Sequence, residues 1–163
     1  MLDPTDDNQL VATLQRTLDG VVEAQNKAIL AQFSLDNKDG ALVRFLGEIY
    51  LAQGLFAEAL AAFKKESHEG FRLLGLSVAY HALGRKAQSS AALEQLSELP
   101  VHAFSIAKGY AYCGDVDQAF EWLERAYTQR NPGLSQVKLQ PLLRNLHGDP
   151  RWKPFLKKMR LAD

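Results

Sequence analysis

A tyrosine followed four positions later by a glycine occurs three times in this chain of 163 residues. The three copies, 30 positions apart, are Tyr50–Gly54, Tyr80–Gly84 and Tyr110–Gly114. Glycine adopts the left-handed backbone that ends a helix without steric cost, so each copy predicts a helix end followed by a reversal of the chain. The tyrosine, one turn earlier, is predicted to pack into the core. We therefore expect a series of helical hairpins.

Two further patterns support helices. Small residues recur in pairs twelve positions apart, which lets two helices cross closely: Gly47 with Ala59, Ser77 with Ser89, and Ala107 with Ala119. Apolar residues also follow helical spacing, and no alternating strand pattern is present. The predicted buried faces are Leu42, Phe45, Leu46, Ile49 and Tyr50; Phe56, Ala59, Leu60 and Phe63; and Val116, Ala119, Phe120, Leu123 and Tyr127. The expected fold class is all-α.

The repeated residues resemble the motif of the tetratricopeptide repeat family. The first copy matches it with Leu46-Gly47, Tyr50, Gly54, Ala59 and Phe63, and carries Glu66 where the family has an alanine. The third copy matches with Ile106-Ala107, Tyr110, Gly114, Ala119, Leu123, Ala126 and Pro132, whereas the middle copy has serines at 77 and 89. The resemblance implies an α-α superhelix. Because family repeats are about 34 residues long, a spacing of 30 implies trimmed loops or second helices.

Five segments follow from this register. Residues 1–39 are predicted to be a helical hairpin or degenerate repeat, with a single long helix through Gly20 as the alternative. Three repeats are predicted at 40–69, 70–99 and 100–131, and a C-terminal cap at 132–163. Within the cap, Pro141 is predicted to start a short helix. A last helix, starting at 150 or 154, should bury Trp152, Phe155, Leu156 and Met159.

A narrower resemblance covers roughly residues 40–160. The residues that carry it are 70–76, 84–86, 121–127, 132–134, 141–143 and 148–152. They look like the tetratricopeptide arrays attached to bacterial adenylate cyclases, winged-helix regulators or protein kinases. The Leu-Asp-Pro-Thr opening also resembles a link between two repeats, which suggests a piece of a longer array. This resemblance implies an accessory interaction or sensing module without the cyclase or kinase activity.

Charge and composition restrict the partners. The 19 basic and 19 acidic side chains cancel, so there is no net field to attract nucleic acid or an anionic membrane surface. No apolar run approaches the roughly 18 residues that cross a bilayer. The acidic first seven residues do not form a secretory signal, and a single cysteine requires no oxidising compartment. The expected location is the cytoplasm.

No catalytic, cofactor or metal site is expected. Cys113 and the four histidines (68, 81, 102 and 147) lack metal-ligand spacing. Asp115 and Asp117 are expected at a helix start, and Glu121 with Arg125 as an i,i+4 pair, rather than as acid–base groups. The basic residues from Arg144 to Arg160 are expected to be a solvated helix face, with an acidic partner as the alternative.

The family resemblance implies a peptide-binding groove lined by first-helix side chains. By register these are Arg44, Glu48, Leu51, Leu74, Val78, His81, Phe104, Lys108 and Tyr112. The mixture of apolar and single charged groups suits a protein or peptide partner. Only Arg44 fits a clamp for a terminal carboxylate, and Glu48 opposes it. The alternatives are that these groups pack against a neighbouring repeat or the N-terminal hairpin, or that the chain is a regulatory domain that senses a ligand or dimerises.

Overall fold

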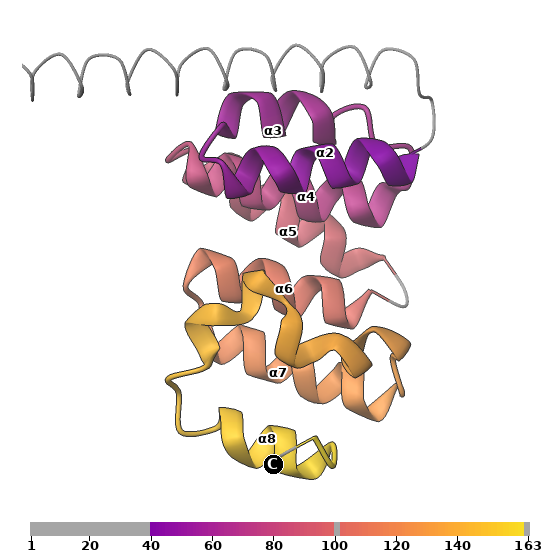
Figure 1. Ribbon diagram of the computed structural model, residues 1–163, viewed down its shortest axis with the longest axis vertical. Coiled ribbons are helices and arrows are strands. Elements are labelled where there is room, and N and C mark those ends of the chain that lie inside the picture. Colours follow the sequence, from indigo (N-terminus) through magenta and orange to yellow (C-terminus); the bar gives the residue numbers. More distant parts are fainter. Residues whose placement is uncertain (1–39, 100–101, 162–163) are drawn as a thin grey trace, which may run out of the picture. The chain divides into compact units, whose positions relative to one another are not determined.

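A computed structural model describes residues 40–99 and 102–161, and every regular element in these ranges is a helix (Figure 1). The helices are α2 (Gly40–Ala52), α3 (Phe56–Phe63), α4 (Glu69–Ala82), α5 (Lys86–Glu98), α6 (Ala103–Cys113), α7 (Val116–Thr128) and α8 (Trp152–Lys158), with the 3-10 helices η1 (Pro132–Leu139) and η2 (Pro141–Leu146) before α8. The all-α prediction is confirmed. The prediction for residues 1–39 lies outside the described residues.

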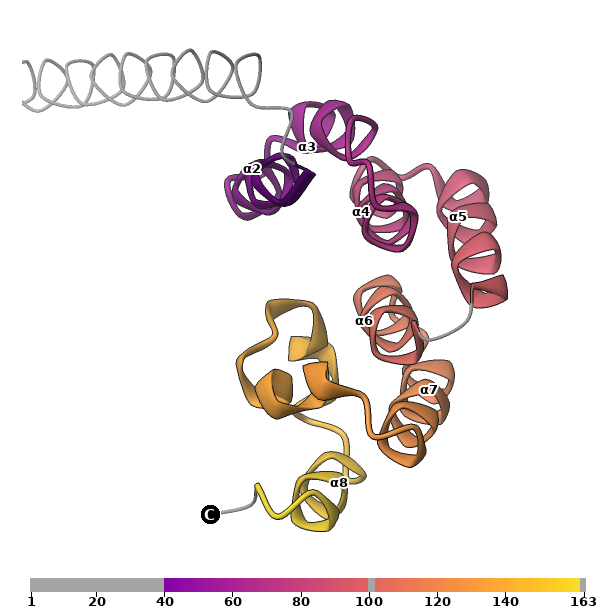
Figure 2. The same cartoon turned by 90° about the vertical axis from the view of Figure 1, so that its right-hand side faces the viewer.

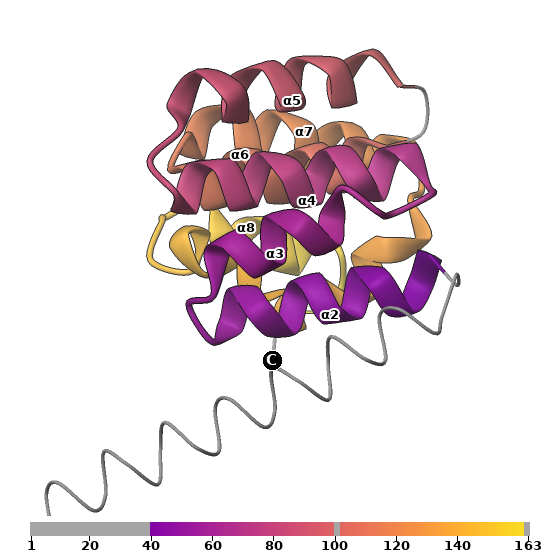
Figure 3. The same ribbon diagram turned by 90° about the horizontal axis from the view of Figure 1, so that it is seen from above.

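Six of the helices form three hairpins, which span residues 40–63, 69–98 and 103–128. The pairs are α2–α3, α4–α5 and α6–α7 (Figure 2). Among the first helices of the pairs, α2 contacts α4 and α4 contacts α6. The axes of these three helices lie roughly alongside one another (Figure 3). The segment η2 packs against α6. The face of α2, α4 and α6 is therefore brought together from three separate hairpins.

The turn inside each hairpin has the same hydrogen bonds. In the first turn the N–H of Leu55 donates to the Tyr50 carbonyl at 2.9 Å, and the N–H of Gly54 donates to the Leu51 carbonyl at 3.1 Å. The second and third turns repeat this pattern around Gly84 and Gly114. Backbone φ values of 76°, 72° and 85° put all three glycines in the left-handed region, which confirms their predicted role as helix caps.

The same turn also forms twice without glycine. The N–H of Asn131 donates to the Ala126 carbonyl and leaves Arg130 at φ 53°, and the N–H of Leu161 donates to the Leu156 carbonyl and leaves Arg160 at φ 58°. An arginine in this region carries steric strain that glycine avoids. These two turns end α7 and α8, and the sequence pattern did not predict them.

Replacing Gly114 by alanine should destabilise the protein by about 1 kcal/mol, because an L-residue is strained at positive φ. No neighbouring atom would lie within 4 Å of the new Cβ, so the cost is one of backbone conformation. Urea unfolding measures it. Gly148→Ala is the matched control, since its Cβ is also free of contacts and its φ is not positive. Equal stability of the two variants would contradict this account.

Small residues allow close approach between helices, partly as predicted. The Ser89 hydroxyl donates to the Ser77 carbonyl at 2.8 Å, so this predicted pair is in direct contact. Gly47 was predicted to pair with Ala59, but it makes room for Phe63, because a Cβ at Gly47 would lie 2.4 Å from the Phe63 ring. A Cβ at Gly75 would lie 2.2 Å from the same ring. Phe63 is thus accommodated between α2 and α4 because both helices present a glycine to it.

Replacing Gly75 by alanine should therefore destabilise the protein by about 1–3 kcal/mol through overpacking. Truncating the ring in Gly75→Ala/Phe63→Leu should relieve part of that cost. The double-mutant cycle from urea unfolding should then show less destabilisation than the sum of the single variants. The cycle of Gly148→Ala with Phe63→Leu is the control and should be additive.

Several predicted core residues are not in the core. Phe45 and Ile49 on α2 are 53% and 42% exposed, and Tyr127 on α7 is 36% exposed. Tyr50 is buried as predicted, but Tyr80 and Tyr110 are only half-buried. The stripes predicted on α2 and α7 were too wide, whereas that on α3 has no exposed member.

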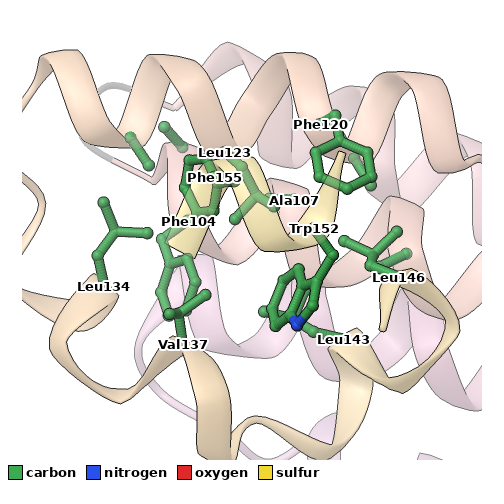
Figure 4. Close-up of a cluster of buried hydrophobic side chains, with 14 of the residues drawn as sticks. Phe104, Ala107, Phe120, Leu123, Leu134, Val137, Leu143, Leu146, Trp152 and Phe155 are labelled. Atoms are coloured by element: carbon green, nitrogen blue, oxygen red, sulfur yellow. The ribbon is translucent and has the colours of Figure 1, made fainter. Parts of the chain in front are cut away.

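The C-terminal segment covers the third hairpin. Its apolar side chains gather against those of α6 and α7 (Figure 4). The buried members from this segment are Leu134, Val137, Leu143, Leu146, Trp152, Phe155 and Leu156. The short helix predicted to start at Pro141 is present as a 3-10 helix. The last helix begins at Trp152, between the two predicted starts, because a first-turn residue such as Pro154 needs no intrahelical N–H bond.

Candidate functional site

A hollow of about 610 Å³ opens on the face formed by α2, α4 and α6, and we refer to it as the groove. Seven of the nine predicted positions line it: Arg44, Glu48, Leu51, Leu74, Val78, Lys108 and Tyr112. They come from three hairpins, so the fold brings together side chains that are up to 68 positions apart, between 44 and 112. Phe45, Ala52, Phe63, Phe71 and Gly75 complete this side of the groove.

The other two predicted positions do not line the groove. Phe104 is buried in the core between α6 and the C-terminal segment, where Gly133 leaves room for its ring. His81 lies edge-on to Tyr112, with the ring centroids 5.8 Å apart. Phe104 is therefore a packing residue, and His81 is a neighbour that contacts a groove residue.

The opposite wall of the groove comes from the C-terminal segment. Its lining residues are Gln136, Gln140, Pro141, Leu142, Arg144 and Asn145. The Asn145 side chain donates from Nδ2 to the Ala111 carbonyl at 3.0 Å, which ties η2 to the last turn of α6. The sequence predicted a cap here but not a groove wall, because this segment lies outside the repeat and has no register from which its direction could be read.

The floor of the groove is apolar. Leu74 and Val78 of α4 are 7% and 1% exposed, and Phe63 is 2% exposed. Gly75 lies between them and exposes no side chain of its own. Burying an apolar group of a partner on this floor would contribute about 25 cal/mol per Å² of area removed from water.

Charged side chains surround this floor. The Arg44 guanidinium lies 4.1 Å from the centre of the Phe71 ring, and the Lys108 ammonium lies 5.3 Å from that of Phe104. Burial lowers the pKa of Lys108; the nearby Glu48 carboxylate raises it and Arg44 lowers it again. Both cations thus lie near aromatic rings, which attract a cation electrostatically.

The carboxylates considered for acid–base chemistry are all engaged elsewhere. Asp115 caps α7, with Oδ1 accepting the Gln118 N–H at 3.1 Å, as predicted. Glu121 pairs with Arg125 at 3.0 Å, which confirms the i,i+4 pair. Asp117 pairs with Arg151 at 2.8 Å, a bond that links α7 to the start of α8. These carboxylates lie outside the groove.

The single cysteine is held in a structural setting. The Ser89 hydroxyl donates to the Ser77 carbonyl at 2.8 Å, and its Oγ lies 3.4 Å from the Cys113 sulfur. Burial raises the pKa of Cys113, the Ser89 contact lowers it, and Asp115 raises it. Since the thiolate is the nucleophile, a raised pKa opposes nucleophilic chemistry.

The fold does bring two histidines together, which their spacing did not predict. His68 and His102 lie edge-to-face with ring centroids 5.6 Å apart, and a Cβ on Gly70 would lie 2.5 Å from the His102 ring. Burial, and then the charge of His68, lowers the pKa of His102. Among the described residues no group of three His, Cys, Asp or Glu side chains is arranged to hold a metal ion.

This pair should make stability depend on pH. Because the pKa of His102 is lower in the folded chain than its ordinary 6.5, the unfolded chain takes up more protons as the pH falls below 6.5. The free energy of unfolding should therefore decrease as the pH is lowered from 6.5, and this group should not affect it at higher pH. Urea unfolding of His102→Gln should show a shallower loss between about pH 7 and about pH 5.5. His147→Gln leaves the pair intact and is the control; a slope reduced equally in both would contradict the assignment.

Comparison of the chain with models of known protein families, with curated proteins and with solved structures finds no match. In the described ranges, no helix combines the length and the apolar character that a membrane span requires. The resemblance to tetratricopeptide repeats therefore stays a prediction from the sequence, and the groove is described from its own geometry.

Proposed function

We propose that this chain is a non-enzymatic scaffold of the tetratricopeptide type, which binds a segment of another protein in the groove. The observation that carries the proposal is the convergence of seven predicted positions from three hairpins on one hollow. A scaffold that recognises a peptide needs such a continuous surface assembled from successive repeats. The α-α superhelix of that family is part of this proposal.

The chemistry of the groove suits an extended or helical peptide. The floor of Leu74, Val78 and Phe63 offers contact for apolar side chains. Gln136, Gln140 and Asn145 on the opposite wall carry amide groups, which can both donate to and accept from a peptide backbone. Phe45, which is 53% exposed, adds an aromatic group at the rim, a residue type enriched where binding energy is concentrated. An apolar centre with a polar rim is the usual anatomy of a protein interface.

Catalysis is less well supported by the same residues. In the part of the groove that the structure describes, the ionisable groups are Arg44, Glu48, Lys108, Tyr112 and Arg144, with neither histidine nor cysteine among them. A single carboxylate beside three cations supplies no paired acid and base, and no nucleophile lies next to a base. This set is better suited to binding than to a reaction.

A second candidate is a regulatory domain that senses a small ligand. The observation that favours it is the volume of the groove, about 610 Å³, which falls within the roughly 300–1,000 Å³ of small-molecule sites. The amides along the opposite wall favour the peptide, because a row of donors and acceptors matches a repeating backbone.

Capture of peptides by groove variants tests the first candidate. The immobilised full chain is incubated with a degenerate peptide library, and bound peptides are identified by mass spectrometry. Leu51→Ala and Tyr112→Ala remove apolar contacts, so each should lower the captured amount by about tenfold, which corresponds to about 1.4 kcal/mol. Leu139→Ala removes an exposed leucine outside the groove and should have no effect.

Each variant is first shown to have the wild-type circular dichroism spectrum and to be folded at the assay temperature. Equal capture by all variants would mean that peptides bind elsewhere. If the chain captures no more peptide than a blank surface does, the peptide-binding proposal is wrong and the small-ligand candidate is favoured.

A further inference from the structure

Two cations in the groove differ from the other described lysines and arginines. Across residues 40–99 and 102–161, only Arg44, Arg72 and Lys108 are half-buried cations, and the rest are exposed. Arg72 has an acidic neighbour, Glu69, at 3.7 Å. Arg44 and Lys108 have no carboxylate within ion-pair distance in the described part of the chain, and both line the groove.

Partial burial of a cation without an ion-pair partner is unfavourable. A cation that loses part of its hydration regains that energy only from an anion or from hydrogen-bond acceptors. The ring of Phe71 beneath Arg44 and that of Phe104 beneath Lys108 compensate part of the loss. Burial lowers the pKa of Lys108 by more than the nearby Glu48 carboxylate raises it. A ligand that brings negative charge would remove this cost.

The charges of the groove are also unbalanced. Arg144 on the opposite wall adds a third cation, and among the described lining residues Glu48 is the single acidic side chain. The three cations come from three elements, α2, α6 and η2. Three cations against one carboxylate leave a net charge of +2, which two or more carboxylates of a ligand balance better than a single terminal carboxylate does.

We propose that the peptide bound in the groove is an internal segment in which acidic side chains alternate with apolar ones. Its carboxylates pair with Lys108 and Arg44, and its apolar side chains rest on Leu74 and Val78. This inference rests on the proposed function, since it specifies what kind of peptide the groove accepts. The same cations should also exclude basic peptide segments, because these would bring positive charges next to those of the groove.

A charge-balanced library tests the selectivity. The degenerate peptides contain equal amounts of acidic and basic residues, and both ends are blocked by acetylation and amidation so that no terminal charge contributes. The full chain should enrich acidic over basic residues in the captured pool by about tenfold. Lys108→Met and Arg44→Met should bring this ratio close to that of the input library. Lys108→Glu leaves two cations and two carboxylates in the lining and should therefore abolish the acidic preference.

Lys153→Met is the matched control, because Lys153 is exposed on α8 and lies outside the groove. Its pool should stay as acidic as that of the wild type. Acidic enrichment that persists in both Arg44→Met and Lys108→Met, or that disappears equally in Lys153→Met, would overturn the inference.

Two further outcomes separate this inference from the proposed function. A pool captured in the groove, and lost in Leu51→Ala, but without charge preference would overturn the inference and leave the scaffold function standing. No capture above a blank surface would remove the scaffold function itself. In a parallel library with free C-termini, selection of the terminal carboxylate alone would also overturn the proposal of an internal segment.

Discussion

The left-handed backbone at Gly54, Gly84 and Gly114 is the constraint on which the described fold depends. Each glycine lets the carbonyls at the end of a first helix be satisfied by the N–H groups of the turn, so the chain can reverse within a few residues. Since the reversals recur every 30 positions, the first helices α2, α4 and α6 become neighbours. The groove exists because three identical turns return the chain to the same face.

Close packing between the hairpins depends on a second group of small residues. Gly47 and Gly75 admit the Phe63 ring, and Gly109 admits the Leu93 side chain, where a Cβ would lie 2.4 Å away. In the middle hairpin the Ser89 hydroxyl donates to the Ser77 carbonyl, and it also lies 3.4 Å from the Cys113 sulfur. Interiors packed at this density tolerate little added volume. The turns therefore set the direction of the helices, and these residues set how closely they approach.

Periodicity predicted those features that repeat, and it failed where the structure does not repeat. The glycine caps and the Asp115 cap were predictable because each has a local residue preference. The exposure of Phe45 and Ile49 was not, since helical spacing defines a stripe but not which edge of it is covered. The left-handed Arg130 and Arg160 gave no signal, because the residue present is not the one that the conformation favours.

Glu66 has a role that no repeating pattern predicts. It stands where the tetratricopeptide repeat family, which the sequence resembles, has an alanine. Its exposed fraction is 3%. Its Oε1 accepts the His68 N–H at 2.8 Å, in the connection between α3 and α4. The carboxylate thus serves the backbone of a turn, a use that depends on the path of the loop and not on any periodic position.

The groove and the stability of the third hairpin depend on the same segment. One face of α6 packs Phe104 and Ala107 against the C-terminal segment, while Lys108 and Tyr112 of the same helix line the groove. The C-terminal segment contributes Leu143 and Leu146 to the core and Gln140 and Arg144 to the groove wall. Asn145 fixes this wall by its bond to the Ala111 carbonyl. Because one segment both covers the last apolar face and bounds the binding surface, the groove has its described form only when the third hairpin is capped.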